Sequence, residues 1–138
     1  SGNNYGPRQH VEKLIPLTIS KALNDEVVPV YGDGLNVRDW IYVEDHCRAI
    51  WRGYKEGKRG KTYNIGARNE MRNIDVVKDI LDCLGKSHFL IRFVNDRAGH
   101  DKRYAIDPKK IETELNWEAK VGWEEGLQRT VESWKNKA

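Results

Sequence analysis

Five stretches of the chain carry apolar residues at the three- and four-residue spacing of an amphipathic helix. The first tolerates Pro16 because this proline lies in the opening turn. Glycines stop the second and third helices at Gly57 and Gly85, and Asp107-Pro108 is a typical start for the fourth. The predicted helices cover residues 12–24, a segment from about 43 to 56, 73–84 with Asn73 as N-cap, 108–115, and about 122–134.

The second predicted helix has a clear apolar stripe. Cys47, Ile50, Trp51 and Tyr54 fall on one side of it, whereas the other side is mainly charged. A helix of this kind normally turns its apolar stripe to the core. We therefore expect these four side chains to be buried.

Short β-rich runs separate the predicted helices, and Gly32-Asp33-Gly34 marks a turn between two of them. The opening segment, up to residue 9, is polar and rich in turn residues, so we expect it to be irregular. The sequence thus predicts a single small mixed α/β domain over residues 1–138, with about five helices and short strands. The predicted strands are residues 27–31, 37–42, 61–65 and 89–94.

Composition agrees with a globular domain, since 38% of the residues are apolar and 33% are charged. The net charge of +3 suits a small anionic ligand but is too mild to predict a nucleic-acid partner. No apolar run is long enough to span a bilayer, so we expect no membrane partner and a cytoplasmic location. Cys47 and Cys83 are interpreted as small core residues of a protein in a reducing compartment.

Common catalytic patterns are absent or weak. Gly32 and Gly34 resemble the start of a dinucleotide phosphate loop, but the third glycine is missing and a strand follows. Tyr54 and Lys58 have the spacing of a proton-transfer pair, yet Gly57 interrupts the helix between them. The four histidines lack the spacing of metal ligands, so we expect no metal site.

Polar residues instead gather at the ends of the predicted elements. Arg38 follows the Gly-Asp-Gly turn, and its planar guanidinium suits a phosphate group, although it could simply pair with Asp33 or Asp39. Gly99 would allow a loop backbone to approach a ligand closely. The candidate set is Asn3, Asn4, Lys13, Tyr31, Arg38, Asn64 and the charged loop of residues 96–100.

Several of these segments form motifs that run in one order along the chain: NNYGPRQ, EKLIP, PVYGDG, RDWIYVEDHCRAI, TYNIG, DRAGHDKRYAID and LNW with GLQRTV. In this order they resemble the C-terminal half of the dTDP-glucose 4,6-dehydratases, within the extended short-chain dehydrogenase/reductase superfamily. The family usually has a proline where this chain has Ala98.

The resemblance implies a nucleotide-sugar binding domain without the N-terminal Rossmann domain, which carries the glycine-rich loop and the catalytic residues. The family eliminates water from dTDP-glucose with NAD as hydride carrier, so this chain alone is expected to be inactive, to bind substrate weakly and not to bind NAD. By the resemblance, Asn4 contacts NAD. The substrate-binding residues it implies are Asn3, Lys13, Leu14, Pro29, Val30, Tyr31, Arg38, Asn64, Asp96, Arg97, Ala98, Gly99 and His100.

Two alternatives remain open on the sequence alone. NNYGP and YNIG are shared with nucleotide-sugar epimerases, decarboxylases and other dehydratases, so the nucleotide and sugar could differ. The chain could also act as a freestanding binding or interaction module. In that case the surface that meets the Rossmann domain in the family would be exposed and could bind that domain or a second copy.

Overall fold

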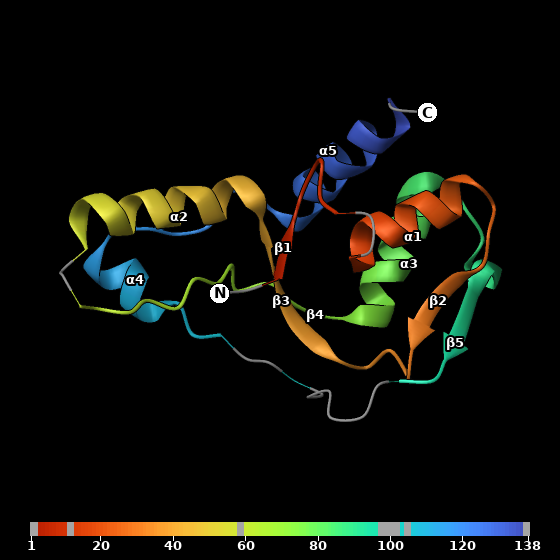
Figure 1. The fold of residues 1–138 in the computed structure, drawn as a ribbon, viewed down its shortest axis with the longest axis horizontal. Helices are drawn as coiled ribbons and strands as arrows, with labels where there is room; N and C mark the ends of the chain where they lie inside the picture. The colour runs from red at the N-terminus through yellow and green to blue at the C-terminus, as the bar shows by residue number, and fades with distance from the viewer. Residues whose placement is uncertain (1–2, 11–12, 58–59, 97–102, 104–105, 137–138) are drawn as a thin grey trace.

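The computed structural model describes residues 3–10, 13–57, 60–96, 103 and 106–136. Within them lie five helices and five short strands, which confirms the predicted mixed α/β class (Figure 1). The elements follow the order β1 (Asn3–Tyr5), α1 (Leu14–Leu23), β2 (Val28–Tyr31), β3 (Val37–Tyr42), α2 (Val43–Glu56), β4 (Glu70–Arg72), α3 (Asn73–Leu84), a 3₁₀ turn (His88–Leu90), β5 (Ile91–Val94), α4 (Lys109–Glu114) and α5 (Trp123–Lys135).

The strands form two small sheets. In the first, β3 is central, with β1 parallel to it on one side and β4 antiparallel on the other. In the second, β2 and β5 pair in parallel. The predicted strand at 61–65 is wrong, because this segment joins no described sheet. Strands β1 and β4, which have only three residues each, were not predicted.

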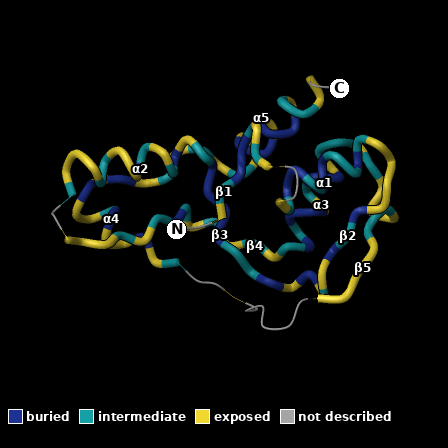
Figure 2. The backbone as a smooth tube through the Cα atoms, viewed as in Figure 1, coloured by how far each residue is buried: buried dark blue, intermediate teal, exposed yellow. Residues whose placement is uncertain are grey.

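Helices α1, α3 and α5 pack together beside the sheets and bury most of the core. Figure 2 shows buried stretches along α1 and α3 and through β3. One cluster joins α1, β1, β3, α3 and α5, and a second joins α1, β2 and α3. Because β3 belongs to the first cluster and β2 to the second, the core fixes the positions of both sheets.

A smaller lobe at the other end of the long axis is formed by α2 and α4 (Figure 1). Its core surrounds Trp117, which is almost completely buried with Ala49 and Ile111. Asp45 links α2 to the segment that precedes α5, because its carboxylate accepts hydrogen bonds from the backbone N–H groups of Lys120 (3.1 Å) and Val121 (3.0 Å).

The prediction for the apolar stripe of α2 is wrong. Ile50, Trp51 and Tyr54 are 56%, 58% and 82% exposed, and Cys47 is exposed as well. The buried residues of α2 are Asp45 and Ala49, because the side of the helix that faces α4 and Trp117 is its small and polar side.

The structure also differs from the sequence predictions at the start of α3 and at one cysteine. Asn73 is the first residue of α3 and not its cap, and Arg72 occupies the N-cap position. Asp107 does act at the start of α4, where its carboxylate accepts from the Lys109 N–H (3.0 Å). Of the two cysteines only Cys83 packs against the core, and it is half-buried. No helix in the described ranges is long and apolar enough to cross a membrane.

Candidate functional site

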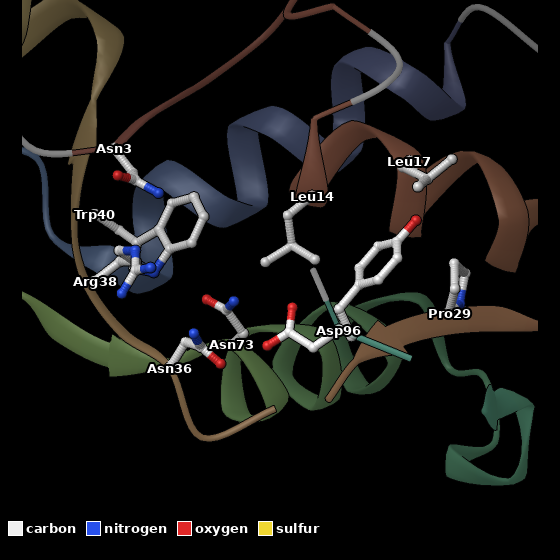
Figure 3. A pocket seen from close by; sticks show the side chains of 10 residues that line it. Asn3, Leu14, Leu17, Pro29, Asn36, Arg38, Trp40, Asn73 and Asp96 are labelled. Atoms are coloured by element: carbon white, nitrogen blue, oxygen red, sulfur yellow. The ribbon is translucent and has the colours of Figure 1, made fainter. Parts of the chain in front are cut away.

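A hollow of about 310 Å³ lies between the two sheets, bounded by α1 and the start of α3 (Figure 3). Asn3, Arg38 and Trp40 stand at one end of it, and Leu17 and Pro29 at the other. The described residues that line it are Asn3, Leu14, Leu17, Pro29, Tyr31, Asn36, Arg38, Trp40, Asn73 and Asp96.

Strand geometry explains why residues distant in sequence meet here. The parallel register of β1 with β3 sets Asn3 opposite Trp40. Side chains alternate along a strand, so Arg38 and Trp40 share one side of β3. The same alternation on β2 turns Tyr31 to the hollow and Val30 to the core.

The alternation of side chains along β3 also places the charges of Arg38 and Asp39 on opposite sides of the strand. Arg38 donates from Nη1 to the carbonyl oxygen of Val37 (2.8 Å) and lines the hollow. Asp39 is buried on the opposite side of β3, where its carboxylate accepts from the backbone N–H groups of Ala67 (2.8 Å) and Asn69 (2.9 Å). Among the described residues, the hollow is therefore lined by one guanidinium, from Arg38, and one carboxylate, from Asp96.

Two buried polar atoms of the lining lack a hydrogen-bond partner within the described part of the chain. They are Nε1 of Trp40, a residue that is 5% exposed, and Oδ1 of Asn73. Buried donors and acceptors in native proteins are nearly always paired, so such pairs of exceptions call for an explanation. Their place in the lining of one hollow is consistent with a wall adapted to a ligand.

A second hollow of about 320 Å³ adjoins the first and shares Asn3, Leu14 and Trp40 with it. Asn4 and Lys13 lie in its lining, so a ligand larger than one hollow could extend from Arg38 to Asn4. Burial lowers the pKa of His46, which contacts Asn4.

Most of the sequence-predicted residues that the structure describes come together. Asn3, Leu14, Pro29, Tyr31, Arg38 and Asp96 line the first hollow, and Asn4 and Lys13 line the second. Val30 contributes its side chain to the core, and Asn64 is exposed and lines neither hollow. The predicted residues Arg97, Ala98, Gly99 and His100 lie outside the described residues.

Four lining residues were missed: Leu17, Asn36, Trp40 and Asn73. Trp40 could have been found, because it alternates with Arg38 on a predicted strand. Leu17 and Asn73 gave no comparable signal, since they were assigned to a helix face and a helix cap. No group of three or more His, Cys, Asp or Glu side chains that could hold a metal occurs among the described residues.

A concave site at strand ends, with apolar walls and a few polar groups including one arginine, defines a ligand-binding α/β domain suited to an anionic small molecule. Comparison with known proteins makes this class specific. The chain belongs to the GDP-mannose 4,6 dehydratase family, whose model matches residues 1–130.

The similar proteins include enzymes that act on other nucleotide sugars. A probable dTDP-glucose 4,6-dehydratase of Sinorhizobium fredii is 56% identical over 94% of this chain. The structure of the Streptomyces venezuelae dTDP-glucose 4,6-dehydratase DesIV, with NAD and TYD bound, is 44% identical over 98% of the chain, with a TM-score of 0.95. The UDP-glucose 4-epimerase of Thermotoga maritima, solved with UDP-glucose, is 30% identical over 99% of it, with a TM-score of 0.92.

The chain spans 39% of the Sinorhizobium protein, 42% of the Streptomyces chain and 44% of the Thermotoga chain. The Sinorhizobium and Streptomyces proteins confirm the predicted resemblance, and the Streptomyces structure confirms the fold.

Proposed function

We propose that this chain is the substrate-binding part of an NAD-dependent dTDP-glucose 4,6-dehydratase. The observation that supports this most strongly is the convergence of Asn3, Tyr31, Arg38 and Asp96, from four separate segments, on one hollow. The higher identity to dTDP-glucose dehydratases than to the UDP-glucose epimerase favours this substrate over UDP-glucose.

In this proposal different residues of the hollow bind different chemical groups of the ligand. Arg38 donates to the diphosphate, for which a guanidinium is suited because it can form two parallel hydrogen bonds to one group. Tyr31 and Leu17 supply apolar surface to the base and deoxyribose. Asn3 and Asp96 bind hydroxyl groups. The ionised carboxylate of Asp96 can only accept, so it binds a hydroxyl that donates and not the diphosphate oxygens.

The remaining length of the family's proteins would supply the Rossmann domain, and NAD, when bound, supplies the hydride acceptor. This chain would meet that cofactor through Asn4, beside the second hollow. With most of the cofactor site and the catalytic groups on the other domain, the chain alone should bind dTDP-glucose weakly and turn over none. The apolar stripe of α2 is the surface we propose for contact with that domain or with a second copy.

A ligand titration tests the proposal. The intact chain is titrated with dTDP-glucose by NMR or calorimetry, next to Arg38→Lys and the control Arg72→Lys, whose side chain pairs with Asp75 and lines neither hollow. Loss of the bidentate contact should weaken binding about tenfold in Arg38→Lys. Equal affinity of the two variants would contradict the role given to Arg38.

The nucleobase separates this proposal from its nearest alternative. Titrations with UDP-, GDP- and CDP-glucose under the same conditions should all give weaker binding than dTDP-glucose. Preference for UDP-glucose would instead favour an epimerase of the kind found in Thermotoga maritima.

A further inference from the structure

Asn4 is held from two directions at the edge of the second hollow. Its side-chain oxygen Oδ1 lies 2.5 Å from Nδ1 of His46, and its carbonyl oxygen accepts from the side-chain amide of Gln9 (2.8 Å). The backbone is fixed as well, since Asn4 pairs with Ile41 in the parallel ladder of β1 and β3. The backbone and the side chain of Asn4 are therefore both restrained.

His46 reaches Asn4 because of the chain's path. Strand β3 runs directly into α2, and His46 lies in the first turn of that helix. The first turn stands next to the end of β1, as the ladder pairs Tyr5 with Tyr42, the last residue before the helix. The imidazole thus projects from a rigid strand–helix junction and not from a loop.

The two contacting atoms determine the direction of the hydrogen bond. An amide oxygen can only accept, so Nδ1 of His46 must carry the proton that it donates. In a neutral ring this leaves Nε2 unprotonated. Burial lowers the pKa of His46 from its usual value, which keeps the ring neutral near pH 7.

We propose that His46 is a positioning residue, which donates from Nδ1 to the Asn4 carboxamide and so directs the Asn4 NH₂ group to a ligand in the second hollow. With its oxygen directed at His46, Asn4 presents its N–H donors to this hollow. Lys13 lines the same hollow and adds a cation. The geometry therefore selects a ligand with an acceptor oxygen at this point. That this ligand is the nucleotide cofactor rests on the function proposed above.

The tautomer of His46 tests this inference without any variant. In the long-range ¹H–¹⁵N spectrum of the intact chain near pH 7, Nδ1 should be protonated and Nε2 unprotonated. His88 is an internal reference of the opposite kind, because its Nε2 lies 2.7 Å from a carboxylate oxygen of Asp82 and should carry the proton. A proton on Nε2 of His46, or averaging between the two tautomers, would overturn the inference.

Two variants separate positioning from simple packing. His46→Asn places an amide N–H near the position of Nδ1, whereas His46→Gln places it near the position of Nε2. The resolved pair of Asn4 side-chain NH₂ signals should be retained in His46→Asn and lost or strongly shifted in His46→Gln. Identical behaviour of the two variants would contradict the inference.

These measurements use no ligand, so they are independent of the proposed function. Failure of dTDP-glucose to bind would leave the tautomer result intact. Conversely, a wrong tautomer would leave the hollow beside Arg38 untouched.

Discussion

Single carboxylates around β3 and α2 organise more of the backbone than their number suggests. Asp39 accepts from the N–H groups of Ala67 and Asn69, and Asp45 accepts from those of Lys120 and Val121. Asp45 also pairs with Arg48 at 2.8 Å. Each acid thus attaches a distant loop to the strand–helix unit that carries Arg38 and His46.

Replacing Asp45 with Asn should show this anchoring directly. The new amide presents an NH₂ group to backbone N–H donors, and the free energy of unfolding should fall by about 1–3 kcal/mol because a buried donor is left unpaired. Urea denaturation measures the change. The neighbouring exposed Glu44→Gln loses a surface ion pair with Arg129 at 3.5 Å and one negative charge in the first turn of α2. Because both are exposed to solvent, it should change the free energy by only about 0.5 kcal/mol.

Polar residues beside predicted strand ends were the most informative sequence signal for the site. Arg38 and Asp96 were found in this way, whereas Asn3 was chosen from a polar, turn-rich segment, and all three line the hollow. The signal could not place Asn64, because the strand expected to carry it does not form. It did select Tyr31, which lines the hollow, whereas Val30, which only the family resemblance implied, contributes its side chain to the core.

At the scale of elements, two glycines play different roles in helices: one ends a helix and the other lies inside one. Gly85 closes α3 in the left-handed conformation, at φ 68°. Gly53 lies inside α2 with ordinary helical geometry. A Cβ added at either position would meet no atom within 4 Å, so the two sites differ in backbone conformation and not in packing.

This pair of glycines gives a matched prediction. Gly85→Ala should lower the free energy of unfolding by about 1 kcal/mol, because alanine is strained at positive φ. Gly53→Ala should raise it by about 0.5–1 kcal/mol, because alanine favours the helix interior. Thermal or urea unfolding of both variants provides the measurement, and a change of the same sign in both would contradict the assignment of the α3 end.

Helix positions were predictable because periodicity and stop residues act locally. The orientation of α2 was not, because periodicity shows that a helix has an apolar side without showing what covers it. Here the neighbours of α2 within the chain, α4 and Trp117, pack against Ala49. Within the described residues, the apolar side of α2, with Ile50, Trp51 and Tyr54, stays exposed.

For the whole molecule, this apolar stripe is the most unusual surface. Trp51 and Tyr54 stack with ring centroids 6.0 Å apart, and Lys55 lies over the Trp51 ring at 5.1 Å. Contiguous exposed apolar side chains of this size usually mark an interface. The fold class and the order of the five helices followed from the sequence, but this exposed surface became visible only in the structure.

The stripe predicts association of the isolated chain at high concentration. Sedimentation velocity over a concentration series should show a rising average mass for the wild type. Ile50→Glu should suppress that rise, whereas Phe89→Glu, at another exposed apolar residue outside α2, should not. A wild type that stays monomeric throughout, or equal effects of the two variants, would count against the stripe as an interface.

The central claim is that β1, β2, β3 and the segment after β5 together form one binding site for a dTDP-sugar. NMR shift mapping with dTDP-glucose tests it most directly, because weak binding is still visible residue by residue. We predict that signals of Asn3, Leu14, Tyr31 and Arg38 shift together with a single dissociation constant, while those of the exposed α2 stripe stay unchanged. Shifts confined to another surface, or separate dissociation constants for these four residues, would contradict the account.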